Sequence, residues 1–491
     1  MGWLSDRLVA TANASEPEHT IITGLSLSSQ RICPGDLYAA LPGARAHGAS
    51  FAASAVEFGA VAILTDADGA ELCADPDVPV LVVEHPRSLL GTLAAKVYGD
   101  PAEDLRLVAV TGTQGKTTTT WLAEGGLQSA GVPAAVVGTV GTRINGVEVR
   151  TALTTPEAPD LHALFAVMRE QGVLGCALEV SSHALVLGRV DGMVFDVAAF
   201  TNLGRDHLDF HADVEEYFAA KASLFTPARA RRGLVNVDDD FGRRLLTESS
   251  VPTRTFSTSG ADASWMALDI VMTATGSRFE VQNPEGDRFP ARVSLPGDFN
   301  VTNALTAIAA LGEAGFDAAG VARGIASSSA VPGRLEQVDS GQDFQAIVDY
   351  AHKPDAVTAS LTALRALTDR RLVVVLGAGG DRDHGKRQIM GEIAARLADV
   401  LIVTDDNPRT EDPAAIRAAL LAGADSVCES GRAELHEAGD RRAAIRMAVS
   451  MAGTGDTVVV AGKGHETGQE IQGSVQPFDD RSVLREELAA R

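Results

Sequence analysis

The chain has 491 residues, of which 45% are hydrophobic and 22% are charged, so its composition is that of an ordinary globular protein. A chain of this length is too large for one hydrophobic core and is expected to form about three domains. Its net charge of −23, from 42 basic and 65 acidic residues, argues against nonspecific binding of nucleic acid or anionic lipid, so an anionic ligand must be held by a local site.

The cysteines and the apolar stretches indicate a cytoplasmic protein. Cys33, Cys73, Cys176 and Cys428 show no Cys-x-x-Cys spacing, which argues against a zinc ribbon and against a disulfide framework. The start of the chain has no apolar h-region, and no run of about 18 apolar residues occurs, so neither export nor membrane insertion is expected.

Residues 20–100 are predicted to form a small α/β unit, with strands at residues 60–64 and 78–83 beside helical stretches. Two turn-rich segments between these elements, Pro34-Gly-Asp-Leu-Tyr38 and Leu41-Pro-Gly43, are by pattern alone surface loops. Glycine and proline near residue 100 mark a boundary.

Residues 108–119 have the order of a phosphate-binding loop, in which an apolar run leads into a glycine turn and then a helix. Gly112 and Gly115 would let backbone N–H groups approach an oxyanion, Lys116 would bring a charge to the phosphates, and Thr117 would ligate Mg²⁺. The pattern G-x-x-x-x-G-K-[ST] fails at its first glycine, which is valine here, whereas the shorter T-G-T-x-G-K-T-T fits. The alternative is a glycine turn followed by a solvent-exposed lysine.

The segment from residue 105 to 332 is predicted to form a doubly wound sheet with ligands at the carboxyl ends of its strands. Its parallel strands are expected at residues 105–110, 134–137, 176–180, 197–200 and 233–237, and residues 249–296 are expected to add antiparallel strands.

Glu179 lies inside one of these strands, and His207 follows another. A carboxylate in a buried strand is costly unless a cation or hydrogen bonds neutralise it, which favours a magnesium ligand over a structural salt bridge for Glu179. For His207 judged alone, the alternative is a turn histidine. Lys221 lies in an amphipathic helix, and by pattern alone we expect it to be solvated.

The segment after residue 338 is predicted to be a third α/β unit, with strands at residues 344–348, 372–376, 400–403 and 457–460. Polar motifs follow all four strands, at the edge where open α/β sheets bind ligands. They are Asp349-Tyr-Ala-His-Lys-Pro354, Gly379-Gly-Asp-Arg-Asp-His-Gly-Lys386, Asp405-Asp-Asn-Pro-Arg409 and Gly462-Lys-Gly-His-Glu466.

Taken together, these motifs resemble those of the Mur ligase family, the ATP-dependent amide-forming enzymes of peptidoglycan precursor synthesis. The resemblance runs over nearly the whole chain. Besides the phosphate loop, Lys221 and the carboxyl-terminal motifs, it rests on Pro34-Gly-Asp-Leu-Tyr38, Thr154-Thr-Pro156, Glu179-Val-Ser-Ser-His183, Asp206-His-Leu-Asp209, Asn300 to Asn303, Gly333-Arg-Leu-Glu336 and Asp349-Tyr-Ala-His352.

The resemblance implies an α/β protein of three domains. A central P-loop-type doubly wound parallel sheet (residues 101–332, ATP-binding) would be flanked by a small UDP-binding α/β domain (residues 1–100) and a Rossmann-like α/β domain for the amino acid (residues 333–491). It also implies a function, which is the addition of meso-diaminopimelate to UDP-N-acetylmuramoyl-L-alanyl-D-glutamate through an acyl phosphate. ATP and Mg²⁺ would be required, and we expect a monomer.

The resemblance further implies roles for individual residues. Lys116, Glu179, His207 and Lys221 would be catalytic, and Thr117, Glu179, His207 and Lys221, the last as a carbamate, would hold the metal. ATP would contact Gly112, Thr113, Gly115, Lys116, Thr117, Thr118, Asn300, Asn303, Arg334 and Asp349. The nucleotide-sugar dipeptide would contact Ser29, Thr154, Thr155, Ser181 and Arg189, and the amino acid Arg382, Asp406, Asn407, Arg409, Gly462 and Glu466.

Two positions depart from the family pattern. Gln114 stands where the family commonly has asparagine, and Ser28-Ser29-Gln30 replaces the uridine-binding Asp-Ser-Arg, of which only Ser29 remains. The alternatives within the same chemistry are a ligase that adds L-lysine and a folylpolyglutamate synthetase, which would lack the first domain and the Asp406-Asn-Pro-Arg409 motif. A third alternative is a non-catalytic nucleotide-binding relative.

Overall fold

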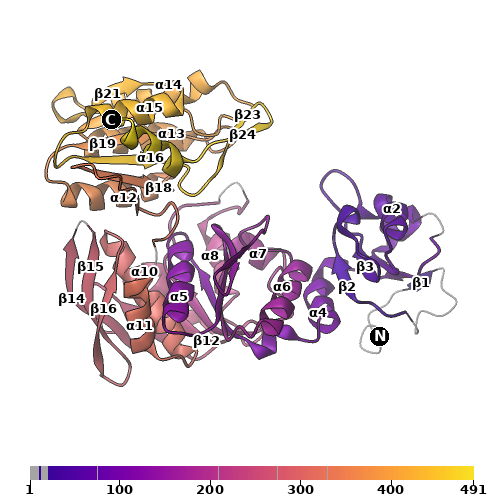
Figure 1. The fold of residues 1–491 in the computed structure, drawn as a ribbon. Helices are drawn as coiled ribbons and strands as arrows, with labels where there is room; N and C mark the ends of the chain where they lie inside the picture. The colour runs from indigo at the N-terminus through magenta and orange to yellow at the C-terminus, as the bar shows by residue number, and fades with distance from the viewer. Residues whose placement is uncertain (1–9, 13–19, 74–75, 208–209, 274, 329) are drawn as a thin grey trace.

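The computed structural model describes residues 10–12, 20–73, 76–207, 210–273, 275–328 and 330–491. The strands lie in three large sheets and one short hairpin, and helices cover the sheets. The central unit adjoins both the first unit, drawn in indigo, and the third unit, drawn in orange to yellow (Figure 1). The predicted three-part α/β architecture is confirmed, whereas the exact domain boundaries at residues 100 and 332 stay a prediction.

The first sheet has the order β1-β5-β4-β3-β2 and is parallel except for β1. Its strands are β1 Ala10–Ala12, β2 Gly24–Ser26, β3 Asp36–Ala39, β4 Ala62–Thr65 and β5 Val80–Val82, and its helices α2 Ala52–Glu57, α3 Ala67–Leu72 and α4 Pro86–Val97. The prediction of a surface loop at residues 34–38 is wrong from Asp36 onward, because β3 is an inner strand whose four residues are buried. Leu37 and Tyr38 point into cores on opposite faces of the sheet, so the turn chemistry of Pro34-Gly35 describes only the entry to the strand.

The central sheet has eleven strands in the order β16-β15-β14-β13-β12-β11-β6-β10-β7-β8-β9. They are β6 Arg106–Thr111, β7 Ala134–Gly138, β8 Gly141–Ile144, β9 Val147–Val149, β10 Gly175–Glu179, β11 Phe195–Phe200, β12 Ala230–Asn236, β13 Thr253–Ser257, β14 Trp265–Thr273, β15 Gly276–Gln282 and β16 Arg288–Val293. All five predicted parallel strands are confirmed, and β14 to β16 supply the expected antiparallel strands. The sheet also gains β13 in parallel and the β8–β9 hairpin at its other edge.

Helices cover both faces of the central sheet. Along β6, Val108 and Val110 face one core, while Leu107 and Ala109 face the other. The first core is closed by α5 Lys116–Ser129, α10 Asp298–Glu313 and α11 Ala318–Ser327. The second is closed by α6 Ala158–Glu170, α7 Ser182–Val186, α8 Val214–Ala222 and α9 Asp240–Glu248. The strand is buried on both faces, which explains its nearly continuous apolar sequence.

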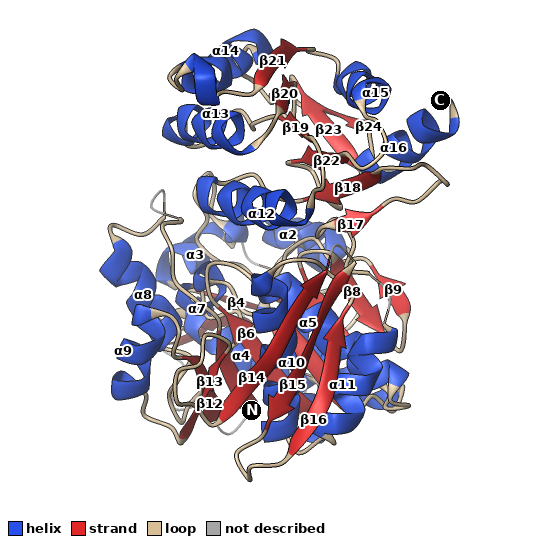
Figure 2. Cartoon of the chain, turned by 90° about the vertical axis from the view of Figure 1, so that its left-hand side faces the viewer, coloured by secondary structure: helices blue, strands red, loops and turns tan. Residues whose placement is uncertain are grey.

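The third sheet has the order β17-β18-β22-β19-β20-β21 and confirms all four predicted strands. Its strands are β17 Glu336–Gln337, β18 Gln345–Asp349, β19 Leu372–Leu376, β20 Val400–Val403, β21 Glu434–Glu437 and β22 Thr457–Ala461. One face carries α12 Pro354–Leu367, α13 Gly385–Leu397 and α14 Pro413–Asp425, and the other α15 Arg441–Met451 and α16 Asp480–Ala489. A hairpin of β23 Gly468–Ile471 and β24 Ser474–Pro477 was not predicted. Figure 2 shows α12 on the side of the third unit that faces the central unit.

Over the described ranges, none of the helices combines the length and the apolar character that a membrane span requires. The four cysteines are all unpaired.

Candidate active site

The phosphate loop joins the end of β6 to the start of α5, in the strand–turn–helix order that the sequence predicts. Gly112 and Gly115 have positive φ angles of 148° and 86°. A Cβ atom on Gly112 would lie 2.0 Å from Oγ1 of Thr201, and one on Gly115 would lie 2.3 Å from Oδ1 of Asn303. Both positions therefore require glycine, on steric grounds as well as conformational ones.

Lys116, the first residue of α5, folds back over this loop. Its Nζ donates hydrogen bonds to the carbonyl oxygens of Gly112, at 2.8 Å, and Thr113, at 3.0 Å. Burial lowers the pKa of Lys116 to about 8, although Glu179 works in the opposite direction. The alternative of a fully solvent-exposed lysine is excluded.

Lys221 lies on α8 and is only 1% exposed, so the pattern-based prediction of a solvated lysine is wrong. It follows Tyr217 by one helical turn and therefore shares its buried face; its Nζ lies 4.5 Å from the centre of the tyrosine ring. The same Nζ donates to the carbonyl oxygen of Gly112 at 2.8 Å. Burial, and then the charge of Lys116, hold the pKa of Lys221 well below its ordinary value.

Glu179 ends β10 beside the loop, and its carboxylate is neutralised by hydrogen bonds. Its Oε2 accepts from Oγ1 of Thr117 at 3.1 Å and from Oγ1 of Thr139 at 3.0 Å, and its Oε1 accepts from the Thr139 N–H at 2.7 Å. No salt bridge to Glu179 occurs within the described residues, so the structural salt-bridge alternative is wrong. The Thr117 hydroxyl and the Glu179 carboxylate are adjacent hard oxygen donors, which fit Mg²⁺.

His207 lies on a turn near the loop, in a left-handed conformation with φ of 54°. Its Nε2 is 3.3 Å from Oδ2 of Asp206, and its ring centre is 4.9 Å from that of His183. Burial lowers the pKa of His207 to about 4, which leaves the ring neutral near pH 7. The rest of the Asp206-His-Leu-Asp209 motif, Leu208 and Asp209, lies outside the described residues.

The described part of the chain contains no group of three or more His, Cys, Asp or Glu side chains that could hold a metal ion. A Mg²⁺ ion here would therefore depend on further oxygen ligands, such as phosphates, water or a modified lysine. This agrees with the chemistry of Mg²⁺, which usually keeps several waters and binds few carboxylates.

Asn300 and Asn303 lie on the first turns of α10, facing the loop. The Asn303 amide donates to Oδ1 of Asn300 at 3.1 Å, and the Asn300 amide donates to the carbonyl oxygen of Pro296 at 2.7 Å. This chain of hydrogen bonds orients the Asn303 oxygen toward Gly115, against which it is closely packed. Thr118 is also buried there, on the first turn of α5.

Arg334 reaches the loop from the start of the third unit. Its Nη2 donates to Oγ1 of Thr117 at 3.1 Å, and its guanidinium lies 4.5 Å from the centre of the Tyr350 ring. Asp349, at the end of β18, accepts from the Leu335 N–H at 3.1 Å and so fixes the segment that carries Arg334. A second link between the units is the ion pair of Lys353 with Asp206.

Of the residues predicted to contact the nucleotide-sugar dipeptide, four lie in the central unit and one lies in the first unit. Thr154 and Thr155 lie beside Glu179: the Thr154 hydroxyl is 3.1 Å from that of Thr139, whereas the Thr155 hydroxyl donates to the Glu179 carbonyl oxygen at 2.8 Å and is buried. Ser181 caps α7, and Arg189 bonds Glu157 at 2.9 Å. Ser29 is separate from them, in the first unit.

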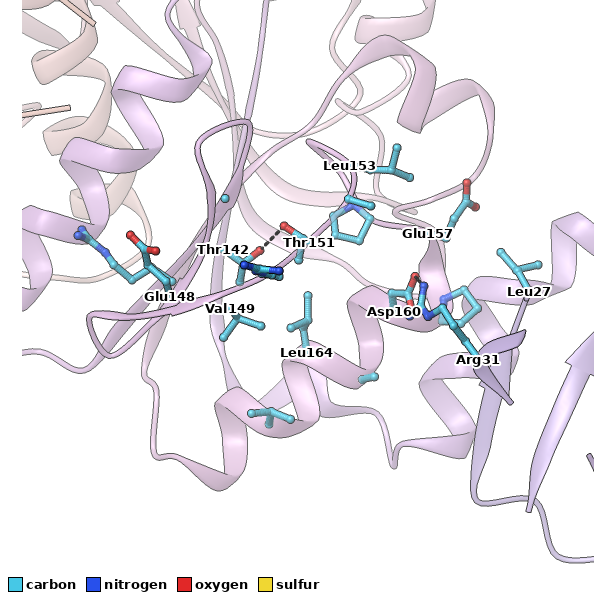
Figure 3. A pocket seen from close by; sticks show the side chains of 18 of the residues that line it. Leu27, Arg31, Thr142, Glu148, Val149, Thr151, Leu153, Glu157, Asp160 and Leu164 are labelled. Carbon is cyan, nitrogen blue, oxygen red and sulfur yellow. Dashed lines mark hydrogen bonds and ion pairs between the residues drawn. The ribbon is translucent and has the colours of Figure 1, made fainter. Parts of the chain in front are cut away.

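A cavity of about 1000 Å³ lies between the first and central units. Figure 3 shows Leu27 and Arg31 of the first unit at one end of the cavity, with Arg31 beside Asp160, while Thr142, Thr151 and Leu164 of the central unit line it farther along. None of the five predicted dipeptide-contacting residues is in its lining, but two neighbouring segments connect it to them. Residues 151–153 line the cavity and lead directly into Thr154, and Glu157 lines it and holds Arg189.

The amino-acid motifs of the third unit converge after β20 and β22. The Asn407 amide donates to Oε2 of Glu466 at 2.9 Å, and the wholly buried Lys463 donates to Oδ1 of Asn407 at 2.8 Å. Gly462 has φ of 119°, and a Cβ atom there would lie 2.6 Å from Oδ2 of Asp406. This cluster joins the third and fourth of the predicted polar turns.

Arg409 and Arg382 differ in their surroundings. The Arg409 guanidinium bonds Oε2 of Glu470 at 3.2 Å and the carbonyl oxygen of Gly380 at 2.6 Å, so protein groups hold this side chain in place. Arg382 lies on the neighbouring loop and is exposed. Sequence reasoning missed Lys353, Lys463 and Glu470. Lys353 and Lys463 lie within the polar motifs that follow two strands of the third unit, whereas Glu470 belongs to no such motif.

Comparison with known proteins places this site in a family. Three family models match successive parts of the chain: "Mur ligase family, catalytic domain" at residues 21–98, "Mur ligase middle domain" at residues 110–311, and "Mur ligase, glutamate ligase domain" at residues 333–464. The UDP-N-acetylmuramoyl-L-alanyl-D-glutamate–2,6-diaminopimelate ligase of Streptomyces avermitilis is 54% identical over 483 residues, which is 98% of this chain and 95% of that protein. The chain belongs to the Mur ligase family.

Two further comparisons agree. The Corynebacterium glutamicum ligase of the same name is 49% identical to this Mur ligase over 99% of the chain and 96% of its own length. A solved structure of a UDP-N-acetylmuramoyl-L-alanyl-D-glutamate–2,6-diaminopimelate ligase superposes with a TM-score of 0.68 at 33% identity, over 96% of this chain and 95% of that one. In this Mur ligase, Glu466 and the β23–β24 hairpin lie beyond the last family match, which ends at residue 464.

Proposed function

We propose that this Mur ligase uses ATP to join meso-diaminopimelate to UDP-N-acetylmuramoyl-L-alanyl-D-glutamate, releasing ADP and phosphate. The observation that carries the proposal is the meeting of Lys116, Lys221, Thr117 and Glu179 at one glycine loop. Relatives at 49% to 54% identity that bear the corresponding ligase name support the choice of substrates.

The proposed chemistry has two steps. A carboxylate is a poor acyl donor, so the glutamate carboxylate first attacks the γ-phosphorus of ATP, and the P–O bond to ADP breaks. The amine of the incoming amino acid then attacks the acyl carbon, phosphate leaves with the C–O electron pair, and the amine loses a proton. The protein's part in the first step is positioning and charge neutralisation, which Lys116, the loop N–H groups and Arg334 can supply.

Magnesium is proposed as the cofactor. Thr117 and Glu179 would hold it beside the phosphates, with neutral His207 nearby and Lys221 contributing carbamate oxygens. Bound Mg²⁺ would neutralise charge on the transferring phosphoryl group. The low pKa of Lys221 supports the modification, because carbon dioxide reacts with the unprotonated amine.

ATP is proposed to lie on the loop between Asn303 of α10 and Arg334, with Gly112, Thr113, Gly115, Thr118, Asn300 and Asp349 completing its site. The cavity between the first and central units is proposed for the nucleotide sugar, with Ser29 at its edge. Residues 151–153 support this placement, because they lead from the cavity to Thr154. The Thr154 hydroxyl contacts the hydroxyl of Thr139, which in turn donates to Glu179. Thr155, Ser181 and Arg189 would border the path of the dipeptide.

The amino acid is proposed to lie in the third unit, with Arg409 binding its distal carboxylate and Glu466 accepting from its distal ammonium. Asp406, Asn407, Gly462 and Arg382 would complete the site. Arginine can bind a carboxylate through two parallel hydrogen bonds, a contact that lysine as a substrate cannot make. We also propose that the protein acts as a cytoplasmic monomer, with domain boundaries near residues 100 and 332.

One assay separates the proposal from its rivals. ADP release would be measured with the UDP-dipeptide and, in turn, meso-diaminopimelate, L-lysine or no amino acid, and with a folate plus glutamate. Release that requires the UDP-dipeptide and diaminopimelate supports the proposal. Preference for lysine would indicate the lysine-adding ligase, folate-dependent release a folylpolyglutamate synthetase, and no release in any arm a non-catalytic relative. The match at residues 21–98 already disfavours the folate enzyme, which would lack the first domain.

A further inference from the structure

The β23–β24 hairpin holds the backbone of Arg409 from outside the matched family domain. The Arg409 N–H donates to the Glu470 carbonyl oxygen at 3.0 Å, and the Gln472 N–H donates to the Arg409 carbonyl oxygen at 2.7 Å. These bonds flank a left-handed residue, with φ of 53°, a conformation that a non-glycine side chain rarely adopts. The hairpin therefore maintains an unfavourable backbone geometry at the residue proposed to recognise the substrate carboxylate.

The Arg409 side chain is fixed by two further contacts. Its Nε donates to Oε2 of Glu470 at 3.2 Å, and its Nη1 donates to the Gly380 carbonyl oxygen at 2.6 Å. Gly379 makes room for this approach, because a Cβ atom there would lie only 3.1 Å from Nη1. Within the described residues, Nη2 makes no hydrogen bond. The guanidinium is thus held by its Nε and by one N–H of Nη1, while donors at the Nη1–Nη2 end remain for a carboxylate.

We propose that Glu470 is a positioning residue that sets the preference for diaminopimelate over lysine, an inference that rests on the function proposed above. An arginine side chain has large rotational freedom, and fixing it only when the substrate binds would reduce affinity. Glu470 fixes Nε beforehand and turns the open end of the guanidinium toward the amino-acid site. Lysine has no distal carboxylate, so it gains nothing from this orientation.

A competing role for Glu470 makes the opposite prediction. If its carboxylate only competed with the substrate carboxylate for Arg409, removing it would improve diaminopimelate binding. The positions of the atoms favour orientation over competition, because Glu470 uses Nε and leaves Nη2 unused. The Glu470 side chain is also 41% exposed, so water screens its repulsion of a second carboxylate.

The experiment compares wild type with Glu470→Ala and Glu470→Gln, the second of which keeps an oxygen acceptor for Nε. Arg409→Ala tests the specificity residue itself. Glu434→Gln is the matched control, since Glu434 is an exposed carboxylate on another edge strand of the same unit, where it pairs with His436. For each protein, kcat and KM are measured with diaminopimelate and with lysine, and KM is measured with ATP and the UDP-dipeptide.

We expect Glu470→Ala to raise the KM for diaminopimelate about five- to tenfold, the cost of ordering one long side chain on binding. The kcat, the KM values for ATP and the UDP-dipeptide, and the kcat/KM for lysine should stay at wild-type values. Glu470→Gln should recover most of the loss, and Glu434→Gln should behave as wild type.

Three results would overturn the inference: an unchanged ratio of kcat/KM between the two amino acids in Glu470→Ala, a ratio that rises, or a loss spread equally over all substrates. Failure of the proposed function would look different, because wild type itself would then fail to prefer diaminopimelate. If wild type prefers it and Arg409→Ala abolishes that preference while Glu470→Ala keeps it, only the role of Glu470 is wrong.

Discussion

Lys116 and Lys221 donate hydrogen bonds to the same atom, the carbonyl oxygen of Gly112, each at 2.8 Å. Two ammonium groups that share one acceptor repel each other, and both are withdrawn from water. Burial lowers the pKa of Lys116 to about 8, and burial first and the charge of Lys116 second hold the pKa of Lys221 well below its ordinary value. The charge of Lys116 therefore favours the unprotonated form of the neighbouring Lys221 amine.

A neutral Lys221 amine is expected to form a carbamate. Lys221→Ala should reduce turnover at least about a hundredfold, since a ligand and charge beside the phosphates would be lost. Short-chain carboxylic acids should partly restore activity, because they can place oxygens in the space left by the side chain. The measurement is turnover with and without acetate or propionate, together with intact mass under carbon dioxide. Lys96→Ala, which removes an exposed lysine, is the control. Wild-type turnover in Lys221→Ala without added acid would contradict the prediction.

Lys116→Ala should abolish substrate-dependent ADP release. The γ-phosphate would lose a counter-charge in a site that contains little water, which we expect to reduce kcat by at least about a hundredfold. Activity is compared at saturating substrates after circular dichroism confirms that the variant is folded. Near-normal turnover would remove the loop from the mechanism.

The free energy of unfolding should change with pH because the pKa of Lys116 is lowered in the folded state. A lysine whose pKa is lowered in the folded state binds fewer protons there than in the unfolded state, between pH of about 8 and the ordinary lysine pKa of about 10.4. Its contribution to the free energy of unfolding therefore rises with pH across that window. Lys116→Met should be more heat-stable relative to wild type at pH 7 than at pH 10. A difference in melting temperature that does not change between these pH values would show that burial does not perturb this lysine.

Arg409→Ala should reduce the preference for diaminopimelate. Losing a charged hydrogen bond costs about 1.5 to 3 kcal/mol, which corresponds to about tenfold to a hundredfold in kcat/KM. The kcat/KM for lysine as a substrate, which lacks the distal carboxylate, should change little. The ratio of kcat/KM for the two amino acids is the measurement. A wild type that prefers lysine, or a variant with an unchanged ratio, would refute the assignment.

Arg441 and Asp480 form a fully buried ion pair beside the amino-acid site, with Nε and Nη2 of the arginine on the two carboxylate oxygens at 2.8 and 2.7 Å. Arg441→Met should destabilise the protein by about 3–5 kcal/mol, because an unpaired carboxylate would stay buried. The double variant Arg441→Met/Asp480→Leu should recover a large part of this loss. Chemical denaturation of wild type, the single variant and the double variant measures the free energy of unfolding of each. Equal losses in the single and double variants would show that the unpaired carboxylate does not cause the destabilisation.

The sequence predicts the architecture well because its strands are buried on both faces. Apolar runs such as residues 105–110 leave little choice of structure, and the positive φ angles of the loop favour glycine at residues 112 and 115. The local pattern fails at Asp36–Ala39 and at Lys221. The turn residues Pro34-Gly35 and the charge of Lys221 favour the surface, but packing against distant segments, which a local pattern does not contain, decides the outcome.

The candidate site is predictable only where motifs mark it. Asp406, Asn407, Gly462 and Glu466 come together as expected for turns at one edge of a sheet. The role of Glu470 was not predictable from the sequence, because it depends on how the hairpin folds back over the loop that carries Arg409. The two residues are 61 positions apart in the chain. The sequence also does not reveal that the Thr155 hydroxyl donates a hydrogen bond to the Glu179 carbonyl oxygen.

The segment that connects the central and third units also carries Arg334, whose Nη2 touches Thr117 on the phosphate loop. If the nucleotide binds on this loop as proposed, the connector is part of its site, and a rotation of the third unit would displace a group that faces the phosphates. Orientation of that unit and occupancy of the loop are then linked equilibria. Thermodynamic reciprocity requires that, if the nucleotide favours one orientation by a given factor, that orientation favours the nucleotide by the same factor. An amino acid that binds only one orientation would therefore change nucleotide affinity without contacting the nucleotide.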